Sequence, residues 1–212
     1  MSEINYKIIL IGNSGVGKTT IFKKLETGEF EEKNISTIGM EKKDLNMNIE
    51  VNNNGKKETK TFFVTLFDTS GQEKFRAVTF NYYKGSNGVL LIYDITSKES
   101  FDNVSLWVDS IKEAIDSNEE SKYAVILIGN KLDLAEQGKR EVTEEEAKDI
   151  CKQYDLIWGG EQSTKDITLD RLTELFGEYV EKIYNVVGEK KVGKRKEKKM
   201  KNYKKKSKCQ CF

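Results

Sequence analysis

The stretch Gly12-Asn13-Ser14-Gly15-Val16-Gly17-Lys18-Thr19 decides the fold that this sequence predicts. It fits the pattern G-x-x-x-x-G-K-[ST], in which glycines permit a tight turn and backbone N–H groups point at phosphate oxygens. The apolar run Tyr6–Ile11 before it predicts a buried strand, and apolar residues at helical spacing after it predict a helix that Gly28 ends. A strand, a glycine-rich loop and a helix form the context in which this pattern binds nucleotide phosphates. The expected phosphate-binding residues are Ser14, Gly15, Val16, Gly17, Lys18, Thr19 and Thr20.

Short apolar runs alternate with amphipathic stretches along the rest of the chain. A turn signal at Asn52–Gly55 predicts a hairpin, and a capping signal at Thr143 predicts the start of a helix. The alternation predicts a doubly wound α/β fold: a mostly parallel six-stranded sheet with one antiparallel edge strand. Besides Tyr6–Ile11, the expected strands are 45–51, 62–67, 89–93, 124–128 and 156–158, and the expected later helices are 101–115, 144–154 and 169–183.

The charge of the chain is divided unevenly. Residues 1–187 carry 24 basic and 33 acidic side chains, whereas residues 188–212 carry 12 basic and 2 acidic ones. We therefore expect a nucleotide-binding domain over 1–187 and a basic, disordered tail over 188–212. No run of about 18 or more apolar residues predicts a membrane-spanning helix, and the first residues lack the apolar core of a signal peptide. Because the chain has no histidine, histidine-dependent triads and metal sites are excluded.

The motif Asn130-Lys131-Leu132-Asp133, just after the predicted strand 124–128, points to guanine as the base. A carboxylate at Asp133 can accept hydrogen bonds from both N1–H and the 2-amino group of guanine. Adenine has neither donor and would leave the carboxylate unpaired, and sites built on such bonds discriminate strongly.

A third motif, Asp68-Thr69-Ser70-Gly71-Gln72-Glu73, follows the second strand of the predicted hairpin. Asp68 at a strand end can hold a water bound to Mg²⁺, and Thr19 can ligate the same ion through its hydroxyl. The N–H of Gly71 can meet the γ-phosphate, and Gln72 can orient the attacking water. These roles predict hydrolysis of a nucleoside triphosphate with Mg²⁺ as cofactor.

Together these motifs resemble a Ras-superfamily small GTPase, closest to the Rab family, over roughly residues 5–187 and the terminal cysteines. The resemblance implies that Thr37 contacts Mg²⁺ and the γ-phosphate, which makes Thr19, Thr37 and Asp68 the metal ligands and Gln72 the catalytic residue. It also implies that Phe30 covers the guanine edge, Lys131 lies on the base, and the loop Ser163-Thr164-Lys165 lies near the guanine O6. The further motifs that carry it are Ser36–Gly39 and Tyr82–Gly85.

The resemblance also implies a mechanism and partners. Loss of the γ-phosphate would release Thr37 and Gly71, so that effectors bind only the GTP state. Hydrolysis would be slow without a GTPase-activating protein, and an exchange factor would reload the nucleotide. We therefore expect a switch in vesicle trafficking, monomeric by default, with a prenyl-binding escort protein and no nucleic acid among its partners.

The chain departs from the Rab pattern in three places. Lys42 and Phe67 replace the Phe and Trp of an aromatic trio that presents the effector surface. The hairpin around residues 46–60 is about eight residues longer than usual, a cheap insertion in chain entropy. Ser70 and Thr164 replace alanines, which leaves binding intact but makes the hydrolysis rate harder to predict.

The ending Cys209-Gln210-Cys211-Phe212, after a basic run, predicts prenylation at Cys209 and Cys211. Lipid and lysines together would hold the chain on an anionic membrane surface, at the cytoplasmic face of an intracellular or plasma membrane with a cytosolic pool. One or two prenyl groups both fit the sequence. Two alternatives stay open: a Ras- or Rho-like signalling GTPase with one lipid, and a non-hydrolysing nucleotide-bound scaffold.

Overall fold

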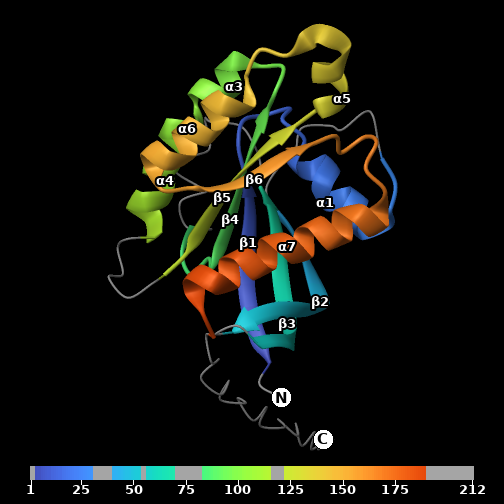
Figure 1. Ribbon diagram of the computed structural model, residues 1–212, viewed down its shortest axis with the longest axis vertical. Coiled ribbons are helices and arrows are strands. Elements are labelled where there is room, and N and C mark those ends of the chain that lie inside the picture. Colours follow the sequence, from blue (N-terminus) through green and yellow to red (C-terminus); the bar gives the residue numbers. More distant parts are fainter. Residues whose placement is uncertain (1–2, 31–39, 54–55, 70–82, 116–121, 190–212) are drawn as a thin grey trace, which may run out of the picture.

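The computed structural model describes residues 3–30, 40–53, 56–69, 83–115 and 122–189. They form one six-stranded sheet in the order β2-β3-β1-β4-β5-β6, shown in Figure 1. Five strands are parallel, and the edge strand β2 pairs antiparallel with β3. The predicted fold class is therefore confirmed. The strands are β1 Ile4–Ile11, β2 Met40–Asn53, β3 Lys56–Thr69, β4 Gly88–Asp94, β5 Ala124–Asn130 and β6 Ile157–Gln162.

Helices cover both faces of the sheet, and alternate residues of β1 separate the two cores. Ile8 and Leu10 pack in one core with α1 and α7, whereas Ile9 and Ile11 pack in the other with α3, α4 and α6. This alternation is why a strand buried on both faces is a continuous apolar run. The helical segments are α1 Lys18–Thr27, α3 Lys98–Asp102, α4 Val104–Ile115, the short α5 Leu132–Leu134, the π-helical turn η2 Ala135–Lys139, α6 Glu144–Tyr154 and α7 Leu169–Val187.

Local signals place several helix ends as predicted. Thr143 and Glu146 form a capping box at the start of α6. Gly28 ends α1 with a φ of 79°, which a residue with a side chain adopts only with strain. One expected helix is divided: Ser97 caps a first segment, α3, and the chain turns at Asn103 before α4 begins. The apolar spacing runs across this break and did not reveal it.

Five of the six strands end later than the apolar runs predicted, and the ends of β5 and β6 are two of them. β5 continues through Gly129 to Asn130, which pair with Tyr93 and Asp94 of β4. Gly129 fits there because a Cβ would lie within 2.9 Å of the Tyr93 hydroxyl. β6 likewise continues past Trp158 to Gln162. These strand ends contain polar residues and glycine, which the search for apolar runs did not detect. The same strand ends carry residues that face the site.

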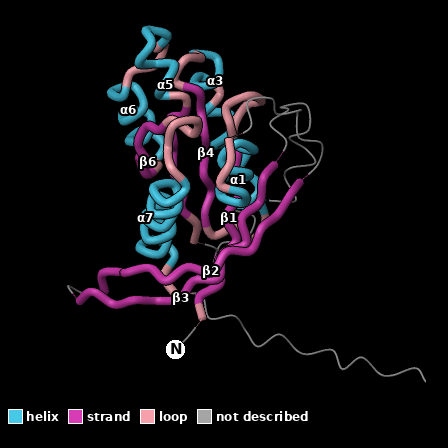
Figure 2. The backbone as a smooth tube through the Cα atoms, turned by 90° about the vertical axis from the view of Figure 1, so that its right-hand side faces the viewer, coloured by secondary structure: helices cyan, strands magenta, loops and turns pink. Residues whose placement is uncertain are grey.

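The β2–β3 hairpin extends past the body of the sheet, from the pair Met40–Thr69 to the pair Asn53–Lys56. Figure 2 shows its distal part turned away from the other strands, beneath the end of α7. There Ile49 and Val51 are buried with residues of α7. Beyond α7, Glu189 forms an ion pair of 2.7 Å with Lys60 of the hairpin. The extra length of the hairpin therefore packs against the segment from which the predicted tail begins.

We expect Ile49→Ala to lower the free energy of unfolding by about 2–3 kcal/mol, because it removes a buried side chain from this contact. Asn46→Ala, an exposed position of the same strand, should change it by less than about 0.5 kcal/mol. Urea unfolding at a fixed nucleotide concentration measures both. Equal unfolding midpoints for the two variants would mean that the distal hairpin does not unfold together with the domain.

Candidate functional site

The loop between β1 and α1 has the backbone that a phosphate site requires. Gly12 and Gly17 have φ angles of 140° and 103°. A Cβ at Gly12 would overlap the carbonyl of Ile92, and one at Gly17 would overlap the side-chain amide of Asn130. Ser14 and Gly15 between them are exposed. Glycine is thus needed twice, for conformation and for close approach, and the middle of the loop is open to a ligand.

Lys18 places a buried cation under this loop. Its Nζ donates to the carbonyl oxygens of Gly12, at 2.9 Å, and Asn13, at 2.7 Å. The side chain is only 5% exposed. Burial lowers the pKa of Lys18 to about 8, although the negative charge of Asp68 opposes that shift. A buried ammonium held mainly by neutral carbonyls favours an anionic ligand, which would restore the charged form.

The oxygen atoms of Thr19 and Asp68 form the other part of the phosphate end. The hydroxyl of Thr19 donates to Asp68 Oδ2 at 2.7 Å, and Asp68 is fully buried. A hydroxyl and a carboxylate are hard oxygen donors of the kind that Mg²⁺ prefers, so the pair fits the ion. Within the described ranges, no group of three or more His, Cys, Asp or Glu side chains could hold a metal.

The shifted pKa of Lys18 gives a pH prediction. At pH 8 about half of the nucleotide-free protein has a neutral Lys18, and bound phosphate would raise the pKa, so GDP binding should take up about half a proton. At pH 6.5 this uptake should vanish because Lys18 is already protonated. Calorimetry in two buffers with different ionisation enthalpies measures it, with Lys18→Arg, which stays charged, as the control. Equal heats in both buffers at pH 8 would contradict the assignment.

Asn130 joins the three predicted nucleotide-binding segments. Its Nδ2 donates to the carbonyl of Val16 in the phosphate loop at 2.8 Å. Its Oδ1 accepts from the backbone N–H of Thr164 at 3.1 Å and from the Thr164 hydroxyl at 2.8 Å. Asn130 is buried, so these bonds replace the water contacts of its amide. One side chain at the end of β5 thus fixes the distance between phosphate loop and base loop.

The two charged residues of the same motif are also held in place. Lys131 has a φ of 69°, and its Nζ forms an ion pair of 2.6 Å with Asp94 at the end of β4. Asp133 accepts a hydrogen bond of 3.0 Å from the Ser163 hydroxyl, which also donates to Asp166 at 2.9 Å. The carboxylate of Asp133 is therefore oriented before any base binds.

Phe30 and Lys165 lie at the edge of this arrangement. Lys24 of α1 connects them: its Nζ donates to the carbonyls of Thr164 and Lys165 at 2.9 and 3.0 Å. The same Nζ lies 5.9 Å from the centre of the Phe30 ring, which is 37% exposed. An exposed aromatic ring beside the base loop is consistent with the role predicted for Phe30, which stays a prediction.

Five predicted functional residues lie outside the described residues, namely Thr37, Gly71, Gln72, Cys209 and Cys211, and so does the substitution at Ser70. Conversely, the structure adds three residues that sequence reasoning missed: Asp94, Lys24, and Trp107, whose indole N–H donates to Asn13 of the phosphate loop at 2.7 Å. Asp94 had a signal, since it is a polar residue at the carboxyl end of an apolar strand, where ligands of such sheets bind. Lys24 and Trp107 stand in amphipathic helices and had none.

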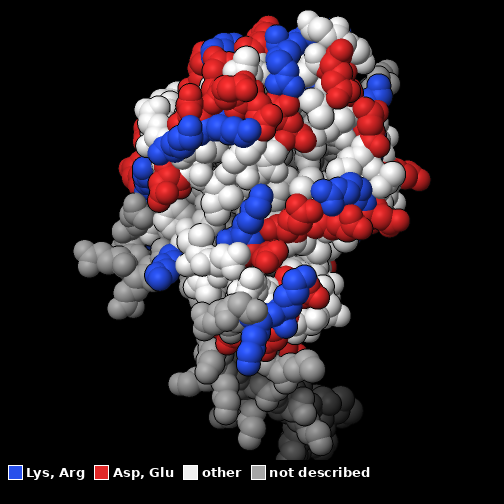
Figure 3. All heavy atoms as spheres, viewed as in Figure 1, with Lys and Arg blue, Asp and Glu red and all other residues white. Residues whose placement is uncertain are grey.

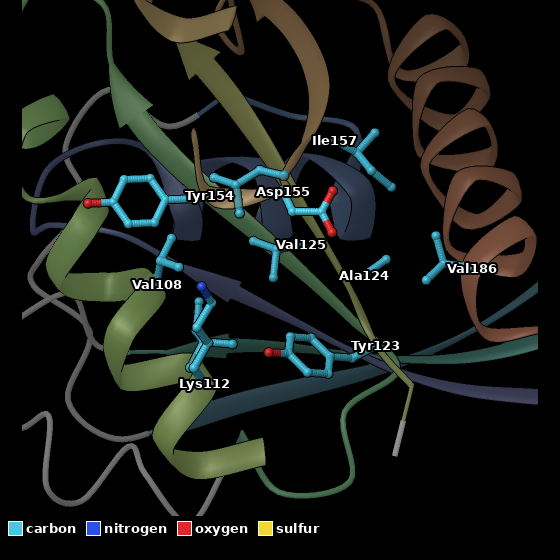
Figure 4. A pocket seen from close by; sticks show the side chains of 11 residues that line it. Val108, Lys112, Tyr123, Ala124, Val125, Tyr154, Asp155, Ile157 and Val186 are labelled. Carbon is cyan, nitrogen blue, oxygen red and sulfur yellow. The ribbon is translucent and has the colours of Figure 1, made fainter. Parts of the chain in front are cut away.

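A separate pocket of about 390 Å³ lies between α4, α6 and the end of α7, as Figure 4 shows. Its lining includes Tyr123, Tyr154 and Lys112. It opens at the amino-terminal ends of β5 and β6, away from the carboxyl ends that carry the motifs. None of the predicted site residues lines it.

Comparison with known proteins identifies the family of this chain. The model of the Ras family matches residues 7–185. "Ras-related protein Rab11A" from Lotus japonicus is 35% identical over 185 residues, which cover 87% of this chain and 74% of the relative. "Ras-related protein Rab-11C" from Dictyostelium discoideum is 34% identical over 190 residues, covering 90% and 77%. "Ras-related protein RABA2d" from Arabidopsis thaliana is 34% identical, covering 87% and 77%.

The fold and the joined loops define a nucleotide-binding α/β protein with a phosphate loop. The chain belongs to the Ras family, and it is a Rab-like small GTPase that takes GTP or GDP with Mg²⁺. In the part of the chain that the structure describes, every helix is too short or too polar to cross a bilayer.

Proposed function

We propose that this Rab-like GTPase is a slow GTP hydrolase and a membrane-attached switch in vesicle trafficking, and that its nucleotide lies across the joined loops of the site. The observation that carries the proposal is Asn130, whose buried amide bonds both the phosphate loop and the base loop. Such a bond fixes the spacing of two half-sites, one for phosphates and one for a base. A ligand with both parts at that spacing is a nucleotide.

In this proposal the phosphate half-site binds the phosphates through one positive charge and a set of backbone N–H groups. Lys18 neutralises the β- and γ-phosphate oxygens, while the N–H groups of the loop and of the α1 N-terminus donate to them. Thr19 and Asp68 would hold Mg²⁺, Asp68 through a water bound to the ion, and Thr37 would join them in the GTP state. The ion, when bound, neutralises charge that develops on the phosphate oxygens during transfer.

The base half-site selects guanine. Asp133, held by Ser163, accepts from N1–H and the 2-amino group, and the loop Ser163–Lys165 lies beside O6. Lys131 lies against the base with its head held by Asp94, and Phe30 covers the exposed edge. Every group that meets the base thus has a second contact that orients it, which limits the freedom lost on binding.

The switch is proposed to act through one end of the hairpin. Met40 and Thr69 are a paired position there, so residues 31–39 and 70–82 both leave from the end next to Thr19 and Asp68. Thr37 and Gly71 would contact the γ-phosphate from these segments, and Gln72 would orient the attacking water. Loss of that phosphate would release both segments together, and effectors would read the change.

The tail is proposed to attach the protein to an anionic membrane through prenylated Cys209 and Cys211. On the face shown in Figure 3, acidic side chains follow α7. Residues 1–187 are acidic overall, so the basic charge that would contact lipid is concentrated beyond Val187. Exchange factor, GTPase-activating protein, effector and prenyl-binding escort would be the protein partners. Mass spectrometry of the native C-terminus separates two prenyl groups from the single lipid of a signalling GTPase.

A single-turnover assay of the full chain tests the hydrolysis proposal. Wild type loaded with GTP and Mg²⁺ should convert it slowly to GDP, and Gln72→Leu should be slower by at least about tenfold, because the water loses its orienting group. Gln137→Leu, which changes an exposed glutamine distant in sequence, is the control and should match wild type. If wild type and Gln72→Leu are equally inert, the scaffold alternative replaces the enzymatic switch.

A further inference from the structure

We propose that Trp107 is a positioning residue for the phosphate loop, which it holds through the side chain of Asn13. The indole Nε1 donates to Asn13 Oδ1 at 2.7 Å, across 94 residues of sequence. The inference rests on the proposed role of this loop in nucleotide binding and adds a residue to it. Neither the loop motif nor the guanine motif includes a residue of α4.

Asn13 connects this hydrogen bond directly to Lys18 at the phosphate end of the site. Asn13 uses its side chain to accept from Trp107 and its main-chain oxygen to accept from Lys18 Nζ at 2.7 Å. A change in the orientation of Asn13 therefore moves a carbonyl that holds the buried ammonium. Trp107 acts on the ligand through this loop, so it is a positioning residue and not a catalytic one.

The two ends of the bond differ in burial. Trp107 is 2% exposed, lies within α4 and packs in the same core as Ile11 of β1. Its backbone N–H donates to Asn103 at 3.1 Å, which continues the helix. Asn13 is half-buried, and the next two loop residues are exposed. A side chain fixed in the core thus holds a loop whose next two residues are exposed.

The chemistry of the indole makes the bond specific. Its N–H is a donor only, so the partner must be an acceptor, and a buried N–H without one is costly. An asparagine without the bond has several rotamers open to it at the start of the loop. We therefore expect removal of either partner to shorten the lifetime of bound nucleotide while the core of the domain stays folded.

The test is a double-mutant cycle on the release of a fluorescent GDP analogue from the full chain with Mg²⁺. Trp107→Phe keeps a ring but removes the N–H, and Asn13→Ala removes the acceptor. Each should raise the dissociation rate about 5- to 10-fold, the scale of one hydrogen bond, and the double variant no more than either single one. Asn13→Asp, which retains an acceptor, should restore the rate to within about threefold of wild type.

The other tryptophan supplies a matched control. Trp158 Nε1 donates to Glu144 at 3.3 Å on an exposed part of the surface, so Trp158→Phe should leave the release rate unchanged. In NMR spectra with ¹⁵N-labelled indoles, Trp107→Phe and Trp158→Phe each remove one signal, which assigns the two indole N–H groups. Asn13→Ala should shift the Trp107 signal and speed its exchange with solvent, whereas Asn13→Asp should keep it protected.

The outcomes separate the two proposals. Multiplicative effects in the double variant, or an unchanged rate in Asn13→Ala, overturn the positioning role of Trp107 and leave the nucleotide site intact. If the wild-type chain does not bind the GDP analogue, the proposed function itself is contradicted. If Trp107→Phe does not fold, Asn13→Ala, which changes a half-buried loop side chain, still decides the question through its release rate and the indole signal.

Discussion

Lys18→Met is expected to weaken GDP binding by at least about 1000-fold, or roughly 4 kcal/mol, while the protein stays folded. The ammonium of Lys18 is the buried cation of the phosphate half-site. Its loss leaves the phosphate charge without this partner on the buried side of the loop. Met keeps the length of the stem. The measurement is competition of unlabelled GDP against a fluorescent analogue.

Folding should survive because Lys18 opposes it at neutral pH. The pKa of about 8 in the folded chain lies below the ordinary 10.5, so the unfolded chain binds the proton more tightly. This contribution makes the nucleotide-free protein more stable as the pH rises from about 8 toward 10.5. Lys18→Met should lack that rise, which thermal unfolding at both ends of the window would detect.

Lys24→Met is the matched control for this prediction. Both lysines belong to α1, both are 5% exposed, and each Nζ donates to two backbone carbonyls. Lys24 holds the base loop, not the phosphate loop, so its loss should cost no more than about tenfold in affinity. Equal losses in the two variants would show that a buried lysine matters here for structure alone.

The parts of the site that sequence alone predicted are those whose chemistry is local. The phosphate loop can be recognised in the sequence because three glycines with positive φ angles lie within six residues of the lysine. Asn130 and Asp133 are readable because their spacing at a strand end fixes where they point. The capping box of α6 is likewise complete within four residues. In each case neighbours in the chain supply the partners.

The missed contacts join residues far apart in the chain. Trp107 and Asn13 are 94 residues apart, and Lys24 and Thr164 are 140 apart. Only the packing of α4 and the base loop around the sheet brings these pairs together, and no periodicity in either segment encodes the partner. A tryptophan on an apolar helix face predicts burial, but not where its N–H donates.

The hairpin shows a different limit. Asn52 and Asn53 predict a turn, since asparagine is depleted in strands. Instead β2 continues through both, paired with Lys57 and Lys56 of β3. The buried side chain of Val51 beside them packs under α7. Tertiary contact of this kind outweighs intrinsic preference, and it comes from a helix more than 100 residues later in the chain.

Asp133→Asn is expected to reverse the base preference of the site. GDP should bind at least about 100-fold more weakly, because an amide N–H would face a guanine donor where the carboxylate had accepted one. A diphosphate of xanthine, which carries oxygen in place of the 2-amino group, offers that N–H an acceptor. It should therefore bind the variant better than GDP does, and wild type worse. Competition of both nucleotides against one fluorescent probe measures the reversal.

Asp166→Asn provides the control with the same change of charge in the same loop. The Ser163 hydroxyl donates to Asp166 at 2.9 Å and to Asp133 at 3.0 Å, so both variants disturb one hydrogen-bond partner of Ser163. Only Asp133→Asn should reverse the preference between the two nucleotides. The GDP affinity of Asp166→Asn should stay within about threefold of wild type. Loss of GDP binding in both variants would mean that Ser163 orients the loop and that Asp133 does not read the base. If Asp133→Asn loses GDP binding but does not bind the xanthine nucleotide better, Asp133 contributes to affinity and does not select the base.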